Sequence, residues 1–386
     1  MRGAQTIQRV RRFARAGVWL VLLDGCDAGR RHPSHEPPPD AGLSALALSE
    51  APPPPAPSLL PPVAHALEEV REQKLEILPP RDDTPRLSFG KGRLAQAMSD
   101  KVVFRDTKDG APVAEATLGP MRAVSEGVDG SLIALGLGSG ARLEPRSNKP
   151  RSFAHVAFFQ GAALFPDLED PSHFYVYYRA EQQLYHYAFE AEAGSFLPIE
   201  DRFPLADCVS APALTRDGAF LCATQEGIER RAPRGRETRF KLPVGVSAAI
   251  RLLPGKRLDE VFSVSPEGEV VHLRLQPGMP VLGRFQLPAS PFAAAVNAEA
   301  LAFVLVSPPA PGSARHWTLL VTDFEGQERF KTELPSQAAQ ANEDWLKAVI
   351  GDKNLAISGF EPLVAVGGAD SVTVWDYARA APLFTR

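Results

Sequence analysis

The sequence is poor in cysteine and has no hydrophobic run long enough to cross a membrane. Three cysteines in 386 residues are too few for a disulfide-rich scaffold. The longest apolar stretch at the start of the chain, AGVWLVLL, covers residues 16–23, whereas a membrane-spanning helix needs about 20 such residues. The sequence therefore predicts no membrane-spanning helix.

Motifs of the common enzyme classes are also missing. There is no CxxC pair and no GxSxG turn, and the eight histidines show no metal-ligand spacing. The glycines of GLGSG, residues 136–140, continue a strand and favour a hairpin turn over a dinucleotide loop. The carboxylates of PDLEDPSH, residues 166–173, miss the EF-hand spacing and favour a solvated loop over a calcium site. We therefore expect no catalytic residue, no bound metal and no cofactor.

The chain is slightly acidic overall, whereas its first 25 residues are basic. The net charge of −4 argues against a nucleic-acid partner. Five arginines in the first 25 residues accompany the short apolar stretch, as in a secretory signal peptide. The next residues, LDGC, resemble the lipobox of bacterial lipoproteins, although Asp24 departs from that pattern. The resemblance implies a signal peptide over 1–25, lipid on Cys26 and a membrane-anchored protein that faces the periplasm. A secreted form and a cytoplasmic form are the alternatives.

The segment that follows is rich in proline and is not expected to form regular secondary structure. About a third of residues 33–62 are proline, which lacks an N–H donor and favours the extended polyproline II conformation. Residues 26–85 are therefore predicted to form a disordered, Pro-rich linker. Apolar spacing within it allows a short helix at 65–78.

Two short signals recur from residue 86 onward. An Arg-Phe pair closes a strand at Arg202, Arg239, Arg284 and Arg329, at spacings of 37, 45 and 45 residues. Turns that end in an acidic residue and glycine, such as TKDG and DFEG, separate other strands, because glycine supplies the positive φ of tight turns. A period of this length with several short strands is typical of a β-propeller.

Dividing the chain by this period predicts an all-β, seven-bladed β-propeller of four-stranded antiparallel blades over residues 86–386. Strands such as LAFVLV, residues 301–306, are apolar on both faces, as expected for a sheet packed between two others. The repeat-like segment 371–386 predicts that the last blade closes the ring against the first, and a short helix is expected at 336–348. The expected blades are approximately 86–119, 120–155, 156–205, 206–243, 244–288, 289–335 and 345–386.

Residues 363–386, LVAVGGADSVTVWDYARAAPLFTR, resemble one unit of a WD-repeat or quinoprotein-like propeller. Trp375-Asp376 stands at the position of the family's Trp-Asp dipeptide. Other units depart from the pattern, because Phe104-Arg105-Asp106 keeps the Asp alone, Thr322-Asp323 keeps a polar ending, and the Gly-His dipeptide is missing. The resemblance implies an architecture, since propellers host many functions.

Two stretches are candidate partner-binding surfaces. The first is rich in tyrosine, which offers an interface apolar area with a polar tip, although cross-strand packing within a blade is the alternative. The second, residues 229–241, is a basic hairpin that could meet an acidic partner or lipid headgroups, or could be an ordinary solvated edge. The candidate residues are Tyr175, Tyr177, Tyr178, Tyr185 and Tyr187 in the first, and Arg230, Arg231, Arg234 and Arg236 in the second.

Cys208 and Cys222 flank the turn TRDG, residues 215–218. Pairing about that turn places them several residues apart along a hairpin, roughly 10 Å, which is too far for a disulfide. We therefore expect two buried free thiols.

Together these features predict a non-enzymatic, monomeric scaffold that binds protein partners in the cell envelope while a lipid anchors it to the membrane. An oxidoreductase or hydrolase that uses the central channel is one alternative. A cytoplasmic propeller scaffold is the other.

Overall fold

The computed structural model describes the chain from residue 86 to 386 with short gaps. The gaps are residues 122, 156–161, 179–180, 191–194, 206–207, 209–211, 225, 234–236, 248–250, 308–314, 336–337, 340–353 and 369–370. The predicted signal peptide, Cys26, the Pro-rich linker and the helix at 65–78 lie outside the described residues. Within the described part, no helix is long and apolar enough to cross a membrane.

The described strands form seven four-stranded antiparallel blades in chain order. Blade one holds β1 (Leu87–Gly90), β2 (Arg93–Ala97), β3 (Lys101–Asp106) and β4 (Pro112–Thr117). Blade two holds β5 (Ala123–Glu126), β6 (Leu132–Leu135), β7 (Ser139–Leu143) and β8 (Arg151–His155). Blade three holds β9 (Ala162–Pro166), β10 (His173–Tyr178), β11 (Gln183–Glu190) and β12 (Ser195–Pro204). Blade four holds β13 (Ala213–Leu214), β14 (Phe220–Ala223), β15 (Gly227–Arg231) and β16 (Glu237–Lys241).

The last three blades repeat this plan. Blade five holds β17 (Arg251–Pro254), β18 (Glu260–Val264), β19 (Glu269–Arg274) and β20 (Val281–Gln286). Blade six holds β21 (Ser290–Val296), β22 (Leu301–Val306), β23 (Trp317–Thr322) and β24 (Glu328–Glu333). Blade seven holds β25 (Leu355–Ile357), β26 (Leu363–Gly367), β27 (Val372–Asp376) and β28 (Ala381–Thr385). Every blade falls within the bounds expected from the sequence, and the predicted seven-bladed propeller is confirmed.

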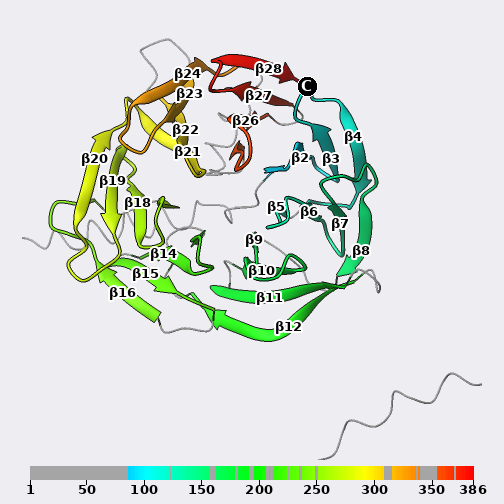
Figure 1. Ribbon diagram of the computed structural model, residues 1–386, viewed down its shortest axis with the longest axis horizontal. Helices are drawn as coiled ribbons and strands as arrows, with labels where there is room; N and C mark the ends of the chain where they lie inside the picture. The colour runs from blue at the N-terminus through cyan, green and yellow to red at the C-terminus, as the bar shows by residue number, and fades with distance from the viewer. Residues whose placement is uncertain are drawn as a thin grey trace, which may run out of the picture. The chain divides into compact units, whose positions relative to one another are not determined.

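The first strand of each blade lies near the axis and the fourth lies on the rim (Figure 1). The inner strands meet around the ring, since β1 contacts both β5 and β25. Blades two and three are also joined at the rim, where the start of β12 pairs in parallel with the end of β8. Each described blade consists of four consecutive strands of the chain. The ring therefore closes because blade seven packs on blade one.

Alternation along the strands explains why both faces are apolar. In β22, Leu301, Phe303 and Leu305 pack against blade five, whereas Ala302 and Val304 pack in a cluster shared with blade seven. Successive side chains of a strand point to opposite faces, and here each face meets a neighbouring blade. Burial on both sides therefore leaves no polar position in the middle of the strand.

The recurring Arg-Phe pair marks the contact between one outer strand and the next blade. Phe285 in β20 covers Gly326 in the last turn of blade six, where a β-carbon on the glycine would lie 2.4 Å from the ring. Phe330 in β24 joins the cluster of Trp375 and Tyr377 of blade seven. The Arg-Phe pair therefore recurs once per blade because its phenylalanine packs at the interface between that blade and the next.

Aspartates stand at the end of the third strand or directly after it in three blades, and they cap the turn that follows. The Asp106 carboxylate accepts a hydrogen bond from the backbone N–H of Lys108 at 2.9 Å. Asp323 accepts two such bonds, at 2.8 and 3.0 Å, and so does Asp376, at 3.0 and 3.1 Å. The residue kept from the Trp-Asp pattern thus has the same structural role in all three blades.

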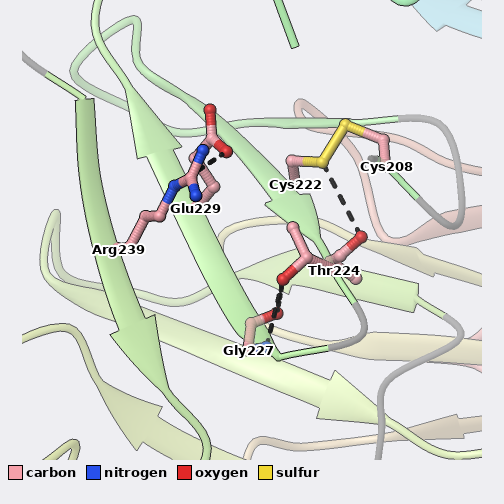
Figure 2. Close-up of a disulfide and its surroundings, with 7 residues drawn as sticks. Cys208, Cys222, Thr224, Gly227, Glu229 and Arg239 are labelled. Atoms are coloured by element: carbon pink, nitrogen blue, oxygen red, sulfur yellow. Dashed lines mark hydrogen bonds and ion pairs between the residues drawn. A yellow bond between two sulfur atoms is a disulfide. The ribbon is translucent and has the colours of Figure 1, made fainter. Parts of the chain in front are cut away.

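The prediction of free thiols at Cys208 and Cys222 is wrong. The two residues form a disulfide, with their Cα atoms 5.3 Å apart, between the entry to blade four and its second strand (Figure 2). The sequence argument assumed an extended hairpin strand reaching back to Cys208. The strand β13 spans only Ala213–Leu214, so Cys208 is not held to that register and can approach Cys222.

The helix expected at 336–348 lies mostly outside the described residues. Ala338 and Ala339 have helical backbone, and the Ala339 N–H donates to the Pro335 carbonyl at 2.8 Å. The rest of that segment cannot be compared with the prediction.

Candidate functional site

One end of the propeller carries the loops that join the first strand of each blade to the second. We call this surface the AB face. Because all seven inner strands run in the same sense along the axis, these loops gather at one end of the ring. The loops of the AB face are residues 91–92, 127–131, 167–172, 215–219, 255–259, 297–300 and 358–362.

Neighbouring loops of the AB face are bonded to one another. The Asn297 side chain of blade six donates to the Ser358 carbonyl of blade seven at 2.8 Å. The Lys91 N–H of blade one donates to the Gly130 carbonyl of blade two at 3.2 Å. The ring of Phe360, from blade seven, lies beside the same glycine. Loops fixed in this way form a preorganised surface across four blades.

Large apolar side chains are exposed on this face. Phe360 is 48% exposed and Val128, two residues from Gly130, is 41% exposed. Leu258, in the corresponding loop of blade five, is 52% exposed. Exposed apolar residues that cluster on a rigid surface are characteristic of interaction sites.

Glu126 ends β5 directly before the loop that holds Val128. Burial raises the pKa of the Glu126 carboxyl to about 8, and the nearby charge of Asp129 raises it further in the same direction. Glu126 is therefore largely neutral at pH 7. The Glu126 carboxyl therefore adds no charge before this loop, and the Asp129 carboxylate next to Val128 is paired with Arg142 at 2.8 Å.

The tyrosines predicted to bind a partner lie in blade three, and four of the five are buried. Tyr175 and Tyr177 pack in the cluster shared with blade four. Tyr178 and Tyr187 pack toward blade two, with their hydroxyls 3.3 Å apart, and burial raises the pKa of both. Tyr185 is half-buried against the same cluster. Most of their surface is used within the ring, so their role in partner binding stays a prediction.

The basic hairpin of blade four carries its own counter-charges. Arg230 pairs with Asp217, and Arg231 pairs with Glu237 at 3.0 Å. Burial alone would raise the pKa of Asp217, but hydrogen bonding from Thr215 and the charge of Arg230 hold it below its usual value.

Arg239 lies on the next strand, 3.7 Å from the Glu229 carboxylate (Figure 2). The three described arginines of the hairpin are thus each paired with a carboxylate. Arg234 and Arg236 lie outside the described residues.

A cluster of potential metal ligands lies at the AB face of blade three. The His186 Nε2 atom is 3.0 Å from the Asp167 carboxylate. His173 completes a group whose ligand atoms all lie within 4.8 Å of one another. The sequence suggested an acidic loop here but not His186, because this residue comes from the middle of a later strand. Pairing β10 with β11 about the turn at 179–182 would have placed His186 opposite Tyr175.

Two solved structures resemble this propeller at low sequence identity. The β-propeller domain of Cps50 (Swd1) from Myceliophthora thermophila matches with a TM-score of 0.52 and 13% identity, over 76% of this chain and 97% of that one. A chain of the mitotic checkpoint complex matches with a TM-score of 0.51 and 10% identity, over 76% of this chain and 89% of that one. The two likenesses show a shared β-propeller fold.

The WD-repeat likeness is one of fold. No protein-family model and no curated protein sequence matches the chain. The two similar structures give no support to the quinoprotein-like alternative. A shared fold at this identity does not indicate what the propeller binds.

Proposed function

We propose that this protein is an interaction module of the cell envelope. A rigid propeller binds protein partners through the AB face, and a lipid on Cys26 holds it at the membrane. The observation that carries the binding role is the exposure of Phe360 and Val128 on hydrogen-bonded, preorganised loops. Binding to such a surface costs little ordering of the protein.

The resembling folds agree with this role. The mitotic checkpoint complex is by name a multi-component assembly, and a WD-repeat-like propeller suits the same kind of use. The alternative of an enzyme acting through the central channel stays a prediction without a specific reaction.

The disulfide supports an exported location. Disulfides persist in the periplasm and outside the cell but are rare in the reducing cytosol. The pair Cys208–Cys222 therefore favours the signal peptide and lipobox interpretation of residues 1–26 over a cytoplasmic scaffold.

The Pro-rich linker would give the propeller reach from its anchor. Thirty residues in the polyproline II conformation extend to about 90 Å at ~3.1 Å per residue. Such a tether raises the local concentration of the propeller near membrane partners. Weak contacts at the AB face would then be enough to keep a partner bound there.

Affinity capture with matched variants tests the binding surface. The whole chain would be immobilised and exposed to detergent-solubilised envelope extract, and specific partners would be quantified by mass spectrometry. Phe360→Asp and Val128→Asp should each reduce capture at least 10-fold. Leu137→Asp is the control, because Leu137 has the same exposure as Val128 but lies in the loop between β6 and β7, at the opposite end of the blade. Capture that is equal in all four proteins would refute the assignment of this face.

Labelling with tritiated palmitate tests the anchor separately. The wild-type protein should incorporate label and sediment with membranes, whereas Cys26→Ala should do neither. An unlabelled wild-type protein would end the lipoprotein part of the proposal and leave the AB face untouched.

A further inference from the structure

Three potential metal ligands converge from different parts of blade three. Asp167 directly follows β9, His173 is the first residue of β10, and His186 lies in the middle of β11. Their ligand atoms lie within 4.8 Å of one another. The Asp167 N–H donates to the His173 carbonyl at 3.0 Å across the loop between β9 and β10, and the His173 and His186 rings meet edge to face with centroids 5.0 Å apart.

Neighbouring groups hold two of the three ligands in place. The His186 ring stacks on the Tyr175 ring, with centroids 4.3 Å apart and planes at 10°. The Tyr175 hydroxyl donates to the Asp167 carboxylate at 3.3 Å, and the same oxygen lies 3.0 Å from His186 Nε2. The side chains of His186 and Asp167 are only 6% and 12% exposed. Outer partners of this kind orient the ligands of a metal ion.

The third ligand opens the cluster toward solvent. His173 is half-buried, and its Nε2 atom lies 3.7 Å from the carboxylate of Asp170. The backbone N–H and the hydroxyl of Ser172 both donate to the Asp170 carboxylate, at 2.8 and 2.5 Å. With Asp167 and Glu169 in the same loop, the entrance attracts cations.

Blade five contains a related arrangement in which Glu260, the first residue of the second strand, stands at the position of His173. His272, in the third strand, stacks on Phe262 with ring centroids 4.3 Å apart, and its Nε2 atom is 3.3 Å from Glu260. Glu260 also meets the guanidinium groups of Arg257 and Arg274, at 3.8 and 3.5 Å. In blade five, permanent cations satisfy the carboxylate. In blade three, a histidine replaces that glutamate, and the carboxylate comes instead from Asp167 in the loop before the strand.

We propose that Asp167, His173 and His186 bind a divalent transition metal ion of the zinc class. Two imidazoles and one carboxylate are a preferred zinc set, and the fourth position would be taken by Asp170 or water. Magnesium and calcium prefer all-oxygen ligands, so they fit this set poorly.

Cobalt and zinc titrations test the proposal. The whole chain would be stripped with a chelator, and Co²⁺ binding would be followed by its visible absorption, with Zn²⁺ added in competition. We expect one ion per chain at this site, an absorption typical of a four- or five-coordinate ion, and displacement by Zn²⁺. His173→Gln and His186→Gln should each weaken binding at least 10-fold. His272→Gln, the matched variant in blade five, should bind as the wild type does.

Two outcomes would overturn the proposal. One is the absence of saturable Co²⁺ or Zn²⁺ binding. The other is binding that is unchanged in His173→Gln, which would place the ion elsewhere in the chain. His173 is half-exposed and tolerates substitution better than buried His186, so this variant decides the matter even if His186→Gln does not fold.

Discussion

The ring of Phe384, in the outer strand of blade seven, covers Gly110 in the last turn of blade one. A β-carbon on this glycine would lie 2.4 Å from the aromatic ring. The backbone N–H and carbonyl of Arg386, two residues further on, both pair with Val372, and its side chain donates to the Asp109 carbonyl at 3.0 Å. These contacts join the last blade to the first.

Substituting Gly110 should weaken ring closure. Gly110→Ala forces a residue with a side chain to adopt a φ of +70° and also pushes a methyl group into Phe384. Gly92→Ala is the matched control, because Gly92 has a φ of +68° but no atom within 4 Å of its added β-carbon. Overpacking costs about 1–3 kcal/mol, so Gly110→Ala should lose that much more unfolding free energy than Gly92→Ala in urea denaturation. Equal losses would mean that Phe384 moves aside freely.

Reduction of the disulfide should destabilise the propeller. Cys208 and Cys222 are 14 residues apart, and closing a loop of this length contributes about 3 kcal/mol. Adding a reductant should therefore lower the melting temperature of the wild type but leave the Cys208→Ala/Cys222→Ala variant unchanged. A thiol titration of the unreduced, denatured protein that detects both cysteines would contradict the pairing.

Stability should fall as pH rises through the range in which Glu126 ionises. The folded state holds the Glu126 proton up to about pH 8, whereas the unfolded chain releases it near 4.5. The folded state thus binds more protons between these values, and unfolding free energy declines as pH increases. At about 1.4 kcal/mol per pKa unit, the decline should be about 2–4 kcal/mol.

Glu126→Gln should flatten this dependence, measured by urea denaturation from pH 5 to 8. Glu144→Gln, which alters an exposed glutamate of the same blade, should not. A wild-type profile that is level over this range would show that the Glu126 carboxyl ionises normally.

Loss of the aspartate cap should cost more than loss of its ion pair. Asp376→Ala removes hydrogen bonds to the backbone of Ala378 and Arg379, which should reduce unfolding free energy by about 1–2 kcal/mol. Arg379→Ala removes only the ion pair to Asp376 from an exposed side chain, which should cost under about 1 kcal/mol. If the two variants unfold at the same urea concentration, the turn does not depend on the cap.

The blade pattern could be predicted from sequence because each signal reflects a local contact that recurs. Phe285 and Phe330 stand at one spacing because each fills the interface to the next blade. Asp106 and Asp376 cap the same turn in different blades. Such contacts depend on where a residue lies within its blade, and the spacing of the repeated residues along the sequence gives that location.

The disulfide and the histidine cluster depend on features that the spacing does not show. The position of Cys208 depends on how short β13 is, and strand ends are hard to locate from sequence alone. The neighbourhood of His186 depends on the register between β10 and β11. The number of tyrosines in blade three could be read from the sequence, but the direction in which their side chains point could not. Because successive side chains of a strand point to opposite faces, the tyrosines pack into the two interfaces of the blade.

Each blade is an unbroken stretch of chain, and this has a consequence for biogenesis. A polypeptide that emerges from a ribosome or a translocation pore can complete its sheets one after another, each docking on the one just made. The exception is the seam between the outermost sheets in the sequence, where Arg386 bonds to a residue 277 positions earlier. Until blade seven has been synthesised, the ring is open and the apolar faces of two blades are uncovered, and it is at this stage that a chaperone would be most needed.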